Sequence, residues 1–107
     1  MIYLEKGERI LKEGMASYMK GLFSLNGKLY LTDQRLVFQS HSAYDHTDAG
    51  NIDLHKISYI KPSHTRLVIP NGLSVTLDTG KIETFAVNNP KDWLAKIQKL
   101  RKANSRN

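Results

Sequence analysis

Residues 27–38 read Gly-Lys-Leu-Tyr-Leu-Thr-Asp-Gln-Arg-Leu-Val-Phe, and this stretch decides the fold class of the chain. Side chains alternate between the two faces of an extended strand, so Leu29 and Leu31 share one face before a polar turn. After the turn, Leu36 and Phe38 again share a face. The stretch therefore predicts a β-hairpin that lays one face on a core. None of its residues indicates catalysis.

Three short polar segments predict further hairpin turns between β-rich runs. Asn-Gly pairs stand at residues 26–27 and 71–72, and this dipeptide suits tight turns because it tolerates positive φ values. The third turn is expected at residues 78–81, which read Asp-Thr-Gly-Lys. Ahead of the first pair, residues 10–25 predict one long or broken strand. Ahead of the second pair, residues 66–69 predict a strand of their own.

Two details of the strands are also predicted. Tyr30 and Val37 fall on the faces opposite the leucines of the hairpin and are expected to point away from the core. The alternation that begins at Ile52 slips at His55-Lys56. Such a slip predicts a bulge or bend between two short strands.

A single clear helix is predicted after the strands. Asn89 suits the N-cap and Pro90 the first helical position, and the charge of Asp92 favours the positive end of the helix dipole. Apolar side chains then recur on one arc of the helix at Trp93, Leu94, Ile97 and Leu100. About seven strands followed by this helix predict a mainly β chain. We expect a small antiparallel barrel or sandwich with the helix over one open end.

Length and composition predict one domain over residues 1–107. A chain of 107 residues with 40% hydrophobic residues can build a single core without cross-links. The absence of cysteine excludes disulfides, cysteine-ligated zinc and a thiol nucleophile, and it fits a cytoplasmic protein. The N-terminal sequence has no apolar segment typical of a signal peptide, and no apolar run is long enough to span a bilayer. Any membrane contact is therefore expected to be peripheral.

The net charge of +6 is concentrated near the C-terminus. From residue 88 onward there are six basic residues and only one acidic residue, Asp92. A nearly neutral body with a basic end is not typical of a nucleic-acid-binding face. The core is expected to cover residues 5–100, and residues 101–107 are expected to form a frayed basic tail.

Several motifs in a fixed order carry a family resemblance. They are Gly7-Glu8-Arg9-Ile10, residues 27–38, the run from Ile52 to Ile57, residues 71–75, Phe85-Ala86-Val87, and Trp93 with Ile97. In this order the chain resembles the GRAM domain, a member of the pleckstrin-homology-like (PH-like) superfold, and small stand-alone bacterial versions look like it. The resemblance implies a seven-stranded antiparallel barrel of two near-orthogonal sheets, capped by one C-terminal α-helix. It also implies a binding role toward phosphoinositides, other anionic lipids or protein partners.

Two groups of cations are candidate sites for an anionic lipid. Every third helix residue from Lys96 is a lysine, and the basic set on the helix is Lys96, Lys99, Arg101 and Lys102. The alternative interpretation is a solvated helix face whose cations complement the helix dipole. The resemblance places a headgroup site of the superfold near Lys20, Lys28 and Tyr30. Because the third position is Tyr rather than Arg, solvated strand lysines are the favoured interpretation there.

Other chemistry has little support in the sequence. His41, Asp45, His46 and Asp48 could supply a zinc or nickel site, but nothing requires residues of one long loop to converge. The sequence contains no nucleophile elbow and no glycine-rich phosphate loop. Asp33 and Arg35 are expected to be structural and to pair with each other. We therefore expect no enzyme activity, no cofactor and no metal.

The sequence favours a non-enzymatic binding module of GRAM type, associating peripherally with an anionic lipid surface. The alternative is a protein-interaction or self-association module that has no lipid ligand and uses the barrel face or a strand edge. A homo-oligomer is compatible with either, and nucleic acid is the least favoured partner. Clustering of Lys20, Lys28, Lys56, Lys61 and Arg66 would favour the lipid, and scattering with exposed apolar side chains would favour a protein partner.

Overall fold

A computed structural model describes residues 2–21, 23–41, 50–65 and 69–104. Its elements follow in the order β1 (Ile10–Lys20), β2 (Phe23–Thr32), β3 (Arg35–Ser40), β4 (Asn51–Asp53), the 3-10 helix η2 (Leu54–Lys56), β5 (Ile57–Thr65), β6 (Ile69–Leu77), β7 (Ile82–Val87) and α1 (Pro90–Asn104). Within these residues the strands pair antiparallel as one seven-stranded sheet in the order β4-β3-β2-β1-β7-β6-β5. The mainly β fold with one C-terminal helix is confirmed. The division into two near-orthogonal sheets stays a prediction.

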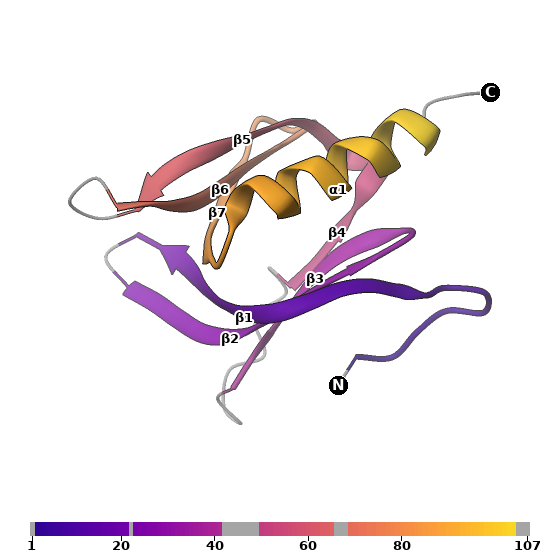
Figure 1. Ribbon diagram of the computed structural model, residues 1–107, viewed down its shortest axis with the longest axis horizontal. Helices are drawn as coiled ribbons and strands as arrows, with labels where there is room; N and C mark the ends of the chain where they lie inside the picture. Colours follow the sequence, from indigo (N-terminus) through magenta and orange to yellow (C-terminus); the bar gives the residue numbers. More distant parts are fainter. Residues whose placement is uncertain (1, 22, 42–49, 66–68, 105–107) are drawn as a thin grey trace.

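The sheet curls around a core that α1 closes. Figure 1 shows the helix lying between the β5-β6-β7 part of the sheet and the β1-β2 part. Trp93 and Ile97 of α1 are buried in this core, as the helical periodicity predicts. Gly14 of β1 faces the Trp93 ring, and a Cβ placed on it would make an ordinary van der Waals contact with that ring at 3.6 Å. The helix thus replaces a solvent-facing opening with packed apolar surface.

The first hairpin is not where its Asn-Gly pair predicts it. β1 ends at Lys20 and β2 begins at Phe23, so two strands stand where one long or broken strand was expected. Gly27 lies inside β2, and a Cβ there would come 2.2 Å from the carbonyl oxygen of Gln39 and 2.7 Å from the Phe38 ring. The glycine therefore serves a close approach within the sheet, which is the usual meaning of glycine in a strand interior.

The second Asn-Gly prediction is wrong as well. Residues 71–72 belong to β6, where Gly72 pairs with Ser63 of β5 and Ala86 of β7. Of the strand predicted at residues 66–69, only Ile69 lies within the described residues, and it begins β6. The turn predicted at residues 78–81 is confirmed between β6 and β7, with Gly80 at φ 91°. The slip at residues 55–56 is confirmed as η2, and it is followed by a register shift in β5.

Tyr30 and Val37 point away from the core, as predicted, and both are nevertheless buried. The two residues pair across β2 and β3 on the outer side of the sheet, and Tyr30 is only 5% exposed. The Lys28 ammonium lies over the Tyr30 ring, 5.5 Å from its centroid. Arg35, on the same side of β3 as Val37, donates hydrogen bonds to the carbonyl oxygen of Tyr3 and to Glu8. Figure 1 shows the chain ahead of β1 folding back alongside it.

The C-terminal end of the helix is more ordered than expected. α1 continues through Asn104, and Arg101 is half-buried against β5. The prediction of a frayed tail from residue 101 is therefore wrong for residues 101–104, and residues 105–107 lie outside the described residues.

Candidate functional site

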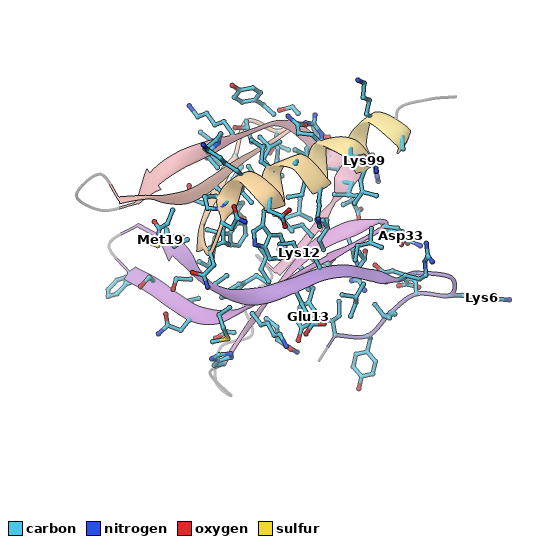
Figure 2. All side chains as sticks on the ribbon, viewed as in Figure 1. Lys6, Lys12, Glu13, Met19, Asp33 and Lys99 are labelled. Carbon is cyan, nitrogen blue, oxygen red and sulfur yellow. The ribbon has the colours of Figure 1, made fainter. Side chains whose placement is uncertain are left out.

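The cations predicted to bind an anionic surface do not form one site. Lys20 ends β1, Lys28 lies on β2, and the other four candidates lie on α1. Figure 2 shows Met19, the neighbour of Lys20, and Lys99 on opposite sides of the view. A single patch that joins both groups is therefore not built by this fold.

Two of the helix cations have structural partners. Arg101 donates from Nη2 to the carbonyl oxygens of Ile57 and Ser58 at 2.9 and 3.1 Å, at the start of edge strand β5. Lys96 lies 3.3 Å from Asp92, which also accepts from Lys12 at 2.8 Å. These two lysines lower the pKa of the Asp92 carboxyl. Arg101 and Lys96 thus stabilise the helix and its contacts.

Lys99 and Lys102 are exposed on the helix surface. They lie near the end of α1 where the dipole is negative, so part of their role is to complement it. Their role toward a lipid surface stays a prediction. Lys28 forms a 2.6 Å ion pair with Glu13 on the outer side of the sheet. The hydrogen bond that Lys28 donates to the Glu13 carboxylate raises the pKa of Lys28.

The tip of the β1-β2 hairpin combines a cation with an exposed aromatic side chain. Lys20 and Phe23 face each other in register across the turn, and Phe23 is 75% exposed. Gly21, at φ 60°, takes the left-handed conformation that the short turn needs. We call Lys20, Gly21 and Phe23 the hairpin tip. Lys20 was a candidate from sequence, whereas Phe23 was missed because the turn was placed at residues 26–27.

Of the five cations whose clustering would favour a lipid site, the four that the structure describes are scattered. Lys20, Lys28, Lys56 and Lys61 come from β1, β2, η2 and β5, and Arg66 lies outside the described residues. In the strand order, β6 and β7 separate Lys61 from Lys20. Any lipid contact must therefore be local to one part of the surface.

A buried ion pair joins the N-terminal segment to the hairpin motif. The Glu8 carboxylate accepts from Arg35 Nε at 2.7 Å and from the Thr32 hydroxyl at 2.6 Å, and its side chain is 0% exposed. Hydrogen bonds from Arg35 lower the pKa of Glu8 to about 2. The expected pairing of Arg35 with Asp33 is wrong, because Asp33 accepts from the backbone N–H of Arg9. Glu8 and Arg35 therefore act as structural residues.

A second buried carboxylate lies between β1 and β7. The Tyr18 hydroxyl donates to Glu83 at 2.7 Å, and both side chains are buried. Burial and the neighbouring carboxylate raise the pKa of Tyr18 above its usual range. The pair satisfies two polar groups inside the core and opens onto none of the clefts described below.

Two clefts open on the described surface. One, of about 380 Å³, crosses the outer side of β2, β1, β7 and β6 and is lined by polar amides and small side chains. The other, of about 440 Å³, lies between the β2-β3 turn and η2 and is lined by Asp33, Gln34, Asp53 and His55. Among the described residues, no group of three or more His, Asp or Glu side chains is placed to hold a metal ion. Of the four loop residues considered and not favoured as metal ligands, only His41 lies within the described residues.

No helix in the described part of the chain is long and apolar enough to cross a membrane. The contacts of the described residues include neither a glycine-rich phosphate loop nor a nucleophile–base pair. What the surface offers is an exposed tip, a polar groove and scattered cations, which are features of recognition.

Solved structures of low sequence identity share the fold. The C-terminal domain of an unknown protein from Leishmania infantum matches with a TM-score of 0.76 and 20% identity, covering 90% of this chain and 86% of that chain. The N-terminal PH domain of human ARAP2 matches with a TM-score of 0.70 and 16% identity, covering 88% and 81%. The linker-DH/PH fragment of p115-RhoGEF matches with a TM-score of 0.73 and 13% identity, covering 92% of this chain but 31% of that chain.

None of the curated protein sequences matches this chain closely enough to serve as a relative. The family model for the GRAM domain matches residues 1–104, which is nearly the whole sequence. With the seven-stranded sheet and its C-terminal helix, this match shows that the chain belongs to the GRAM domain family.

Proposed function

We propose that this chain is a non-catalytic binding module that associates weakly and reversibly with anionic lipid surfaces through the hairpin tip. One observation carries the proposal: Phe23 is 75% exposed at the end of a hairpin and contributes nothing to the core. An aromatic side chain beside a lysine suits the boundary between headgroups and acyl chains, where apolar contact and attraction to anionic lipid act together.

The expected strength follows from the two side chains. Burying a phenylalanine side chain contributes about 2 kcal/mol, and each cation near an anionic surface contributes about 1 kcal/mol. Together these two contributions support a weak, salt-sensitive contact with the membrane surface rather than stable membrane anchoring. Figure 2 shows Lys99 on the opposite side of the view from Met19, which lies next to the tip, so we expect Lys99 to add only long-range attraction.

Vesicle co-sedimentation tests the proposal. Purified chain is mixed with neutral vesicles, phosphatidylserine vesicles and phosphoinositide vesicles, each at low and physiological salt. Phe23→Ser is expected to lower partitioning onto anionic vesicles by about tenfold or more, and Lys20→Gln by about fivefold. Tyr3→Ser is the matched control, because Tyr3 is also exposed but lies in the N-terminal segment. Equal loss in the Phe23 and Tyr3 variants would contradict a contact through the tip.

A protein partner is the second candidate, and one observation favours it. Tyr59 of β5 and Ile82 of β7 both pair with Thr76 of β6, and both are more than half exposed. They form a short apolar row on the outer side of the sheet. Addition of a partner strand to edge strand β5 is less favourable, because β5 contains Pro62 and Arg101 occupies two of its carbonyl oxygens.

A further inference from the structure

The cleft of about 380 Å³ on the outer side of the sheet has no role in the lipid contact. We call it the outer groove and define it by Met15, Ser17, Asn26, Asn71, Ala86 and Asn88. These residues come from β1, β2, β6, β7 and the segment between β7 and α1. Because these residues are far apart in sequence, no sequence motif predicts the groove.

Strand register explains why a groove forms here. Ser17 of β1 pairs with Asn26 of β2 on one side and with Ala86 of β7 on the other. Ala86 in turn pairs with Gly72 of β6. Directly paired residues of an antiparallel sheet lie on the same face, so small side chains follow one another across four strands. This row forms a low floor across the strands, with Met15 along its margin.

The lining is polar without being charged. Its side chains carry no carboxylate, lysine or arginine, and His41 is its one ionisable side chain, although the whole chain has a net charge of +6. The Ser17 hydroxyl donates to Asn26 Oδ1 at 2.9 Å, which orients the Asn26 amide so that its NH₂ group has a second direction to donate. The backbone N–H of His41 donates to the Asn26 carbonyl oxygen at 3.0 Å and fixes that end of the groove.

The dimensions suit an extended chain. Neighbouring strands lie about 4.8 Å apart, so the path from β2 to β6 is about 14 Å long, which is four or five residues of extended peptide. A primary amide presents one acceptor and two donors, the same groups that a peptide main chain alternates. We propose that the outer groove binds an extended, uncharged peptide segment of a partner protein, with the amides of Asn26 and Asn88 hydrogen-bonding its main chain.

Other ligand classes fit the lining less well. A phosphate or carboxylate ligand needs several convergent cations, and the residues that line the groove supply only the imidazole of His41. A sugar ring usually stacks on an aromatic side chain, and the apolar lining here is Met15, Ala16, Ala86 and Val87. The thioether of Met15 instead suits a small apolar side chain of a peptide.

A selection from a phage-displayed library of linear heptapeptides tests the proposal, with the whole chain as bait. Ala86→Phe fills the floor of the groove, and Thr84→Phe is the matched control, two residues away on the same face of β7. Asn88→Ala removes one amide from an exposed position. Selected peptides are synthesised with blocked ends, their affinities are measured by fluorescence polarisation, and melting temperatures confirm that each variant is folded.

We expect enriched peptides without a charged consensus. Their binding should weaken about tenfold or more in Ala86→Phe and stay within about twofold of wild type in Thr84→Phe, as loss of a central contact predicts. In ¹⁵N–¹H correlation spectra, the peptides should shift the side-chain NH₂ signals of Asn26 and Asn88. The proposal is overturned if no peptide prefers wild type over Ala86→Phe, if the shifts map elsewhere, or if chitotriose or inositol hexakisphosphate shifts the groove while peptides do not. Vesicle binding is measured separately, so either proposal can fail without the other.

Discussion

Neutralising Glu8 is predicted to destabilise the fold far more than neutralising Glu13, an exposed acid that pairs with Lys28 at a similar distance. In the Glu8→Gln variant the side chain keeps its shape, but Arg35 loses its charged partner while remaining only 14% exposed. The Thr32 hydroxyl, which donates to Glu8 at 2.6 Å, also loses a strong acceptor. The change therefore leaves the mostly buried Arg35 guanidinium without an opposite charge to offset its desolvation.

The magnitude follows from the pKa of Glu8 and from burial. The pKa falls from 4.5 to about 2, and a shift of that size corresponds to about 3 kcal/mol of preference for the charged form in the folded state. Removing one partner of a buried ion pair typically costs about 3–5 kcal/mol. We therefore expect Glu8→Gln to lower the free energy of unfolding by about 3 kcal/mol.

Urea unfolding followed by the fluorescence of Trp93 measures this change, because the indole is buried in the core. Glu13→Gln is the control, since Glu13 pairs with Lys28 at 2.6 Å but both side chains are more than a third exposed. Exposed pairs contribute about 0–1 kcal/mol, so the control should change stability by less than 1 kcal/mol. Equal losses in the two variants, or a loss below 1 kcal/mol in Glu8→Gln, would refute the assignment of Glu8 as a buried structural anchor.

Three further predictions concern stability. Because the pKa of Glu8 is lower in the folded state than in the unfolded state, its contribution to the free energy of unfolding is complete above pH 4.5 and is lost as the pH falls toward 2. Over that interval, unfolding curves should show wild type losing about 3 kcal/mol more of its free energy of unfolding than Glu8→Gln. Gly27→Ala should cost about 1–3 kcal/mol, since its Cβ would meet the Gln39 carbonyl oxygen, and an unchanged melting temperature would contradict that contact. Arg101→Met should cost about 1 kcal/mol and speed amide exchange at the start of β5, while Lys99→Gln should do neither.

Much of the fold could be predicted because local patterns and tertiary contacts agree there. The leucines at positions 29 and 31 alternate in sequence and are fully buried in the structure. The arc that contains Trp93 and Ile97 likewise packs against the sheet. Where each local preference supports the same structure, sequence reasoning is reliable.

The Asn-Gly pairs show where local reasoning fails. Gly27 is required by the approach of Phe38 and Gln39, and that approach depends on the register between β2 and β3. No property of residues 26–27 alone separates this use of glycine from a turn. The real turn contains Gly21, which the pattern of residues 10–25 gave little reason to prefer. The burial of Tyr30 and Val37 on the outer side of the sheet likewise does not follow from the alternation of the strands alone.

The candidate sites were predictable only in part. Lys20 was identified from the resemblance, but its neighbour Phe23 gained meaning only when the turn was located at residues 21–22. Arg101 was interpreted as a surface cation, although it bonds to two carbonyl oxygens of β5. The outer groove combines residues from position 15 to position 88, so only the sheet order brings them together.

Vesicle co-sedimentation of wild type and Phe23→Ser at physiological salt tests the proposed function most directly. We expect wild type to sediment with phosphatidylserine or phosphoinositide vesicles but not with neutral ones, and Phe23→Ser to lose about tenfold or more of that partitioning with an unchanged melting temperature. Wild type that stays in the supernatant with every vesicle, or a Phe23→Ser variant that sediments as wild type does, would contradict lipid binding through the hairpin tip.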